Sequence, residues 1–312
     1  MSYIRKYFEI SMLLIFGLIW LYMIYVKGLP LVIPDISSMI FVGKHYLSPL
    51  LYALVIQFFV ITFWKRKRDS VWIPYLYIPL ILCTVLLHFN FKSWTPLVNA
   101  TLYDPIYMNI DYYLSSIVQW SQVMILELPF YSPEYLYYKV FIIMFIVSFV
   151  VHLTFDSMQN FRKVVVGFCL ILLIGGISYW LFPAIGPFVY QDYTTGFTPV
   201  QHRMYTLYSY VCDNRLIPPG YFTSALAAMP SLHVAHSFFL TFMAIRSVKI
   251  LGFLYVPLFV YIFIAAIASR WHYIIDLPFG ILLSITVIWL VNRIYSDSQH
   301  VNNPDLSRIS VK

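Results

Sequence analysis

The sequence predicts an all-α membrane protein, a polytopic bundle of about eight transmembrane helices with both termini cytoplasmic. Of its 312 residues, 61% are hydrophobic and only 11% are charged. A soluble domain could not cover so much apolar surface with so few charges, so most of the chain must face lipid. The apolar runs are continuous rather than alternating, which argues against a transmembrane β-barrel.

Eight apolar runs have about the length that a helix needs to cross a bilayer. They cover residues 8–26, 48–64, 71–88, 138–155, 164–182, 231–245, 250–268 and 273–292. No signal-peptidase pattern follows the first run, so we expect that span to be retained. We divide the chain into two additional N-terminal helices (1–70), a six-helix core (71–293) and a disordered cytoplasmic tail (294–312).

The basic residues predict the orientation of the bundle. A net charge of +7 is spread mainly over short loops, which indicates membrane orientation and not a nucleic-acid partner. The run from Lys65 to Arg68 is the strongest cytoplasmic signal. With that loop inside, the polar ends of the last three apolar runs fall on the outer or lumenal side.

A long loop from 89 to 137 is predicted on the same outer side. It is rich in polar and aromatic residues, and its segment Ile106–Gln119 fits an amphipathic helix lying on the membrane surface. A passive cover for the outer face and a role in substrate recognition fit this loop equally well.

Two polar clusters at helix ends are the candidate site. The first, Ser269–Asp276, contains Arg270, His272 and Asp276, and the second, Pro230–His236, contains two histidines. Ionisable groups at the ends of membrane segments are costly, which favours a functional interpretation over histidines that merely satisfy a helix end. If His272 and Asp276 share one helix face, the carboxylate can fix one imidazole nitrogen as N–H and leave the other lone pair free.

Two mechanisms fit these residues. In the first, His272 attacks phosphorus and becomes a transient phosphohistidine, Asp276 orients it, and His233 protonates the leaving oxygen. In the second, His233, His236 or His272 joins Asp276 in binding zinc, which activates water.

Phosphate binding needs positive charge or free N–H groups near the reacting phosphorus. The outer loops offer three arginines, and the helix that Pro230 and Ser231 open offers its first N–H groups. The predicted phosphate-binding residues are therefore Arg270, Ser231, Arg203 and Arg215.

Three segments carry a family resemblance over about residues 165–292. Pro230-Ser231-Leu232-His233 resembles the Pro-Ser-Gly-His motif of the type-2 phosphatidic acid phosphatase superfamily, and His272-Tyr273-Ile274-Ile275-Asp276 resembles its closing His-x-x-x-Asp motif. Phe182-Pro183-Ala184-Ile185-Gly186-Pro187 resembles a segment of the inositol phosphorylceramide synthase branch.

The resemblance implies that residues 71–293 form the catalytic core. His272 is then the nucleophile, Asp276 its orienting partner and His233 the acid, with no metal and no cofactor. Two departures favour a phosphotransferase over a phosphatase: Leu232 replaces the motif glycine, and the basic first motif of the phosphatases is absent.

We therefore predict a lipid phosphotransferase of the outer or lumenal face, in a bacterial inner membrane or a eukaryotic endomembrane. Its partners would be the bilayer, a membrane lipid phosphoester substrate and a hydroxyl acceptor or water. A lipid-phosphate phosphatase with water as acceptor is the first alternative. A non-enzymatic lipid transporter is the second, although transporters usually place polar groups near the midplane and often show inverted repeats.

Overall fold

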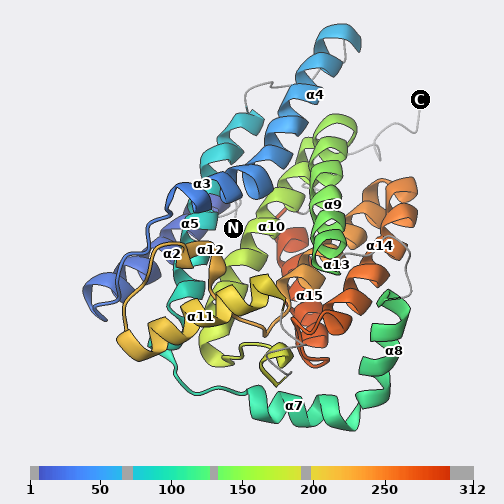
Figure 1. The fold of residues 1–312 in the computed structure, drawn as a ribbon. Helices are drawn as coiled ribbons and strands as arrows, with labels where there is room; N and C mark the ends of the chain where they lie inside the picture. The colour runs from blue at the N-terminus through green and yellow to red at the C-terminus, as the bar shows by residue number, and fades with distance from the viewer. Residues whose placement is uncertain (1–6, 65–72, 127–132, 191–197, 296–312) are drawn as a thin grey trace, which may run out of the picture.

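The structure is a computed structural model that describes residues 7–64, 73–126, 133–190 and 198–295. Within these ranges all regular elements are helices, packed as a bundle with shorter helices across one end (Figure 1). The predicted all-α fold class is confirmed. The predicted tail, 294–312, lies almost wholly outside the described residues.

Seven helical segments of the described chain are long and apolar enough to cross a membrane. They are Phe8–Tyr25 (α2), Ile36–Val60 (α3, η1 and most of α4), Pro74–Ser93 (mostly α5, Tyr77–Ser93), Leu136–Phe155 (within α9, Pro133–Phe155), Met158–Leu181 (α10), Lys249–Ala268 (α14) and Asp276–Ile294 (α15). Large apolar side chains of α2 and α14, among them Leu14, Leu18 and Phe253, are exposed on their outer surfaces, as lipid-facing side chains must be.

The sixth predicted span, 231–245, corresponds to α13 (Leu232–Ser247), which has 16 residues. At a rise of about 1.5 Å per residue it is about 24 Å long, shorter than a hydrocarbon core of about 30 Å. It lies in the interior of the bundle, against α9, α10, α14 and α15. The predicted helix is present with about its predicted length, but it is not among the seven segments that are long and apolar enough to cross a membrane. Neighbouring helices rather than lipid cover its polar and small residues.

The second membrane segment begins earlier than predicted. Its first helix, α3 (Ile36–Val42), is capped by Asp35, whose carboxylate accepts the N–H of Ser38 at 3.0 Å. The chain then passes through a short π-helix, Gly43–Leu47 (η1), into α4 (Ser48–Trp64) without leaving the helical conformation. An aspartate followed by the start of an apolar run is a helix-start signal.

Three helices lie outside the bundle core. The predicted surface helix Ile106–Gln119 is two helices, α7 (Asp104–Tyr113) and α8 (Ser115–Leu126), separated at Leu114. The third, α11 (Pro199–Asn214), opens with a capping box at Thr198. Helices α7 and α11 lie across the end of the bundle where α10 ends and where α13 and α15 begin (Figure 1).

The last span starts at Asp276 and not at residue 273. Residues 271–275 form turns between α14 and α15. In these turns the N–H of Tyr273 is bonded to the carboxylate of Asp276, and the N–H of Ile274 to the carboxylate of Asp111. Side-chain acceptors of this kind compete with helical hydrogen bonding, so the predicted shared helix face for His272 and Asp276 is wrong.

Helix α10 forms the centre of the molecule. It packs against α5, α9, α13 and α15, and most of its residues between Phe161 and Gly176 are buried. Its C-terminal end leads into residues 182–187, and the helices around it bring the two predicted polar clusters to that same end.

Candidate active site

His272 is buried in the turn before α15 and is held by a backbone carbonyl. Its Nδ1 lies 2.9 Å from the carbonyl oxygen of Ala228 and 3.3 Å from Oδ2 of Asp276. A carbonyl oxygen can only accept, so Nδ1 carries the proton and the lone pair lies on Nε2. The spacing of four residues does bring the carboxylate beside the ring, but through a turn and not through a helix.

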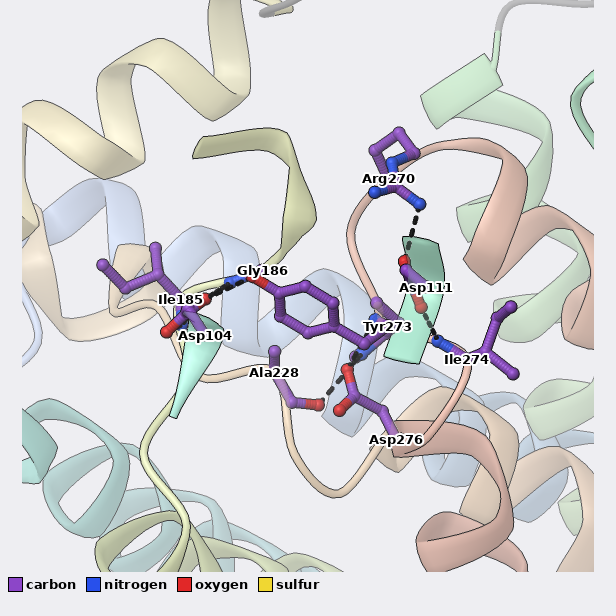
Figure 2. Close-up of polar contacts among 10 residues, drawn as sticks. Asp104, Asp111, Ile185, Gly186, Ala228, Arg270, Tyr273, Ile274 and Asp276 are labelled. Carbon is purple, nitrogen blue, oxygen red and sulfur yellow. Dashed lines mark hydrogen bonds and ion pairs between the residues drawn. The ribbon is translucent and has the colours of Figure 1, made fainter. Parts of the chain in front are cut away.

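Asp276 is fully buried at the start of α15. Its Oδ2 accepts the N–H of Tyr273 at 2.9 Å in addition to facing His272. Its Oδ1 has no hydrogen-bond partner among the described residues. Figure 2 shows the carboxylate of Asp276 close to the carbonyl of Ala228. Both groups lie within 3.3 Å of Nδ1 of His272.

His233 faces His272 from the first turn of α13. The two ring centroids are 6.4 Å apart, and His233 also lies against the rings of Tyr137 and Phe141, at 5.0 and 4.7 Å. Within the part of the chain that the structure describes, its imidazole makes no hydrogen bond. It is thus a partly buried histidine with both ring nitrogens uncommitted beside the predicted nucleophile.

Ser231 precedes α13 and is fully buried. Its Oγ has no hydrogen-bond partner among the described residues, while its backbone N–H is bonded to the carbonyl oxygen of Asp276 at 3.1 Å. The first N–H groups of a helix lack intrahelical acceptors, so this end of α13 presents several donors together. Gly280 permits this approach of α15, because a Cβ there would lie 2.5 Å from the carbonyl oxygen of Ser231.

The segment 182–187 supports the site from the end of α10. Ala184 accepts the backbone N–H of Ala228, the residue that holds His272. Gly186 has a φ of +129°, and a Cβ there would lie 2.8 Å from the carbonyl oxygen of Trp271. Only glycine suits this backbone conformation and this contact. The predicted motif therefore serves to position the loops of the two histidine clusters.

Helix α7 binds these loops through two buried aspartates that the sequence analysis did not select. Asp104 accepts the N–H groups of Ile185 and Gly186 and the hydroxyl of Tyr273, the last at 2.8 Å (Figure 2). Burial raises the pKa of the Asp104 carboxyl, and these hydrogen bonds partly offset that rise. Burial likewise raises the pKa of Tyr273, which keeps its hydroxyl a donor.

Asp111 lies two turns further along the same face of α7. Its carboxylate accepts Nη1 of Arg270 at 2.8 Å and the N–H of Ile274 at 2.9 Å (Figure 2). Arg270 is itself buried and has a φ of +58°, which turns the chain from α14 into the turn that carries His272. Spacing of seven residues puts Asp104 and Asp111 on one helix face, a signal that was available in the sequence.

The guanidinium of Arg270 is thus engaged with α7. Its Nη2 lies 3.6 Å from the sulfur of Met108, on the same helix. That Arg270 binds phosphate stays a prediction, but this geometry favours a different role, which is to fix the loop that carries His272.

Asp111→Asn is expected to lower the free energy of unfolding by about 3 kcal/mol, because it leaves a buried guanidinium without its counter-charge. The side-chain amide of the new asparagine can still accept the N–H of Ile274, so the lost free energy of unfolding comes from the ion pair alone. Thermal unfolding in detergent measures it, with the exposed Asp213→Asn as the matched control. Equal melting temperatures for the two variants would contradict a stabilising ion pair.

Arg203 and Arg215 lie on α11 and just after it, and both are exposed. Nη2 of Arg215 lies 3.4 Å from the carbonyl oxygen of Leu97, at the surface. Among the described contacts, neither arginine touches His233, His272 or Asp276. Their phosphate-binding role also stays a prediction.

His236 is buried and lies against the rings of Phe141, Phe145 and Phe168. Its two ring nitrogens face the carbonyl oxygens of Leu232 and Phe168, at 2.8 and 3.3 Å. In the described ranges, no three His, Cys, Asp or Glu side chains come together in a way that could hold a metal ion.

Comparison with known families places this arrangement in a class. The sequence profile of the PAP2 superfamily matches residues 120–290, which include α9, α10, α13 with His233, the turn with His272, and the part of α15 that carries Asp276. The chain belongs to the PAP2 superfamily of membrane phosphatases and phosphotransferases, which act on lipid phosphoesters generally without a metal. No curated protein and no solved structure matches it.

Proposed function

We propose that this protein is a membrane lipid phosphotransferase in which His272 is the nucleophile. The observation that carries the proposal is the environment of the imidazole. The carbonyl of Ala228 and the carboxylate of Asp276 occupy the Nδ1 side, which leaves the lone pair of Nε2 free, and the ring of His233 lies 6.4 Å from that of His272, measured between centroids. A nucleophile, an orienting carboxylate and a nearby acid are the parts that covalent phosphoryl transfer requires.

In the first step, the Nε2 lone pair of His272 forms a bond to phosphorus and the bond from phosphorus to the leaving oxygen breaks. Protonated His233 gives its proton to that oxygen. In the second step, neutral His233 takes the proton of an acceptor hydroxyl, whose oxygen attacks phosphorus and releases His272. Asp276 stabilises the positive charge that the imidazole carries between the two steps.

The acceptor is proposed to be a lipid hydroxyl. Tyr137 and Phe141 line one side of His233, and apolar walls of this kind favour an amphiphilic acceptor over bulk water. The absence of the phosphatases' basic first motif supports the same choice. The sequence motifs favour an activity like that of the inositol phosphorylceramide synthase branch, in which the acceptor would be a sphingolipid.

Purified protein given a lipid phosphoester labelled at phosphorus, with and without candidate lipid alcohols, tests the acceptor. We expect label in a second lipid, with EDTA present throughout. Label that reaches only water would identify a phosphatase instead. Activity that EDTA abolishes and zinc alone restores would favour the metal mechanism.

His233→Ala is expected to slow transfer from lipid substrates by about 100-fold or more, because the leaving alkoxide is basic and needs a proton. An activated aryl phosphoester has a good leaving group, so its rate of histidine phosphorylation should fall much less. Single-turnover kinetics on the two substrate types measure the difference. Equal losses on both would exclude His233 as the acid.

We further propose that the site lies at the outer or lumenal face. The supporting signal is the basic run from Lys65 to Arg68, which falls outside the described residues. Single cysteines at position 67 and in the segment before α13, placed in a chain without the native cysteines, can be probed with an impermeant thiol reagent. Labelling at position 67 in intact cells would reverse the assignment.

A further inference from the structure

Lys92 lies in the last turn of α5 (Tyr77–Ser93), within a membrane-spanning segment. The lysine is half-buried, and no carboxylate of the described residues pairs with it. Its Nζ lies over the face of the Tyr179 ring, 6.0 Å from the ring centroid. A partly buried ammonium is costly to hold without an anion, so Lys92 is placed to bind an anion that the described residues do not supply.

The side chain lies at the same end of the bundle as the histidines. Helix α5 packs against α10, and Gly176 of α10 lies in contact with His88 and Phe91 of α5. One residue earlier, Gly175 contacts Leu232 at the start of α13. Phe91 and Leu232 directly precede Lys92 and His233, respectively, in the chain, so the packing on Gly175 and Gly176 brings the end of α5 that carries Lys92 close to the start of α13 that carries His233.

The other cations of the outer side are exposed or already paired. Lys27, Lys44, Lys139, Arg203 and Arg215 are exposed. Arg270 is bonded to Asp111. The two undescribed segments on this side, 127–132 and 191–197, contain no lysine or arginine.

We infer that Lys92 is a phosphate-binding residue, whose ammonium contacts a non-bridging oxygen of the substrate phosphorus held between His233 and His272. The inference rests on the proposed function and adds to it a residue outside the 120–290 match to the family. The ammonium supplies charge, while Ser231 and the first N–H groups of α13 supply directional donors. Attack by a neutral imidazole leaves the negative charge on the phosphorus oxygens, where one cation can stabilise it.

Lys92→Met tests this with two readouts. We expect kcat/KM for the lipid phosphoester to fall by about 100-fold or more, as when a single transition-state donor is removed. The melting temperature in detergent should not fall, because the apolar side chain removes an unpaired buried charge. Lys92→Arg, which keeps the charge, should recover part of the activity, and Lys27→Met, at an exposed lysine of the same side, should match wild type.

Inhibition by a phosphate-like anion distinguishes a phosphate-binding role of Lys92 from a purely structural role. Vanadate mimics the five-coordinate phosphorus, and it should inhibit Lys92→Met far more weakly than Lys27→Met. Wild-type activity or unchanged vanadate inhibition in Lys92→Met would overturn the inference while leaving the proposed function intact. A wild-type protein with no activity on any lipid phosphoester would instead contradict the proposed function on which the inference rests.

Discussion

His272→Ala is expected to reduce turnover by about 10⁴-fold or more, since no other side chain can take over covalent attack. His236 is the only other histidine that the sequence motifs place near His272 besides His233. Both of its ring nitrogens face backbone carbonyl oxygens, and phenylalanine rings surround it. The loss should appear in kcat, measured with the labelled lipid substrate. It should not change when the acceptor lipid is varied, because the first chemical step is removed.

The matched control is His202→Ala, at an exposed histidine of α11 on the same side of the molecule. It should retain wild-type turnover. Residual activity above about one tenth of wild type in His272→Ala would contradict the assignment of the nucleophile. Loss in both variants would indicate that the outer helices, rather than the imidazole, limit the reaction.

Asp276→Asn should produce the second largest loss, about 100-fold to 1,000-fold in kcat. In a serine-protease triad, removal of the orienting carboxylate costs about 10⁴-fold, largely because the histidine takes the wrong tautomer. Here the carbonyl of Ala228 accepts from Nδ1 at 2.9 Å, closer than Asp276 at 3.3 Å. The tautomer is therefore retained in the variant, and the loss reflects the missing negative charge beside the phosphorylated imidazole.

Steady-state kinetics of Asp276→Asn and of the exposed Asp213→Asn measure this effect. A loss as large as that of His272→Ala would mean that the carboxylate alone holds the ring and that the carbonyl contributes little. A loss below about threefold would remove Asp276 from the mechanism.

The fold class and the contact between His272 and Asp276 could be predicted from the sequence. Continuous apolar runs determine a helical membrane bundle, and a histidine four residues before an aspartate brought His272 and Asp276 together. The backbone conformation that makes this contact differs from the expected one, because hydrogen bonds to Asp276 and Asp111 hold the segment as a turn and not as a helix. The spacing of the two residues therefore predicted their contact but not the backbone conformation.

The residues that could not be predicted act across long sequence distances. Ala228 contributes a backbone carbonyl, which no side-chain pattern reveals. Asp111 pairs with Arg270, which is 159 residues away in the sequence. Nothing in the sequence near Arg270 indicates this partner on α7, so the arginine was assigned to phosphate instead. Lys92 lies on a helix far from both motifs, and its relation to His233 arises only from the packing of α5, α10 and α13.

The chemical state of His272 during turnover tests the central claim most directly. Wild-type protein can be quenched within one turnover, digested under alkaline conditions that preserve phosphoramidates, and analysed by mass spectrometry with isomer standards. We expect a phosphorus adduct on His272 at Nε2, the nitrogen left free by Ala228 and Asp276. An adduct at Nδ1, an adduct on His233, or turnover with no adduct on any histidine would contradict the account.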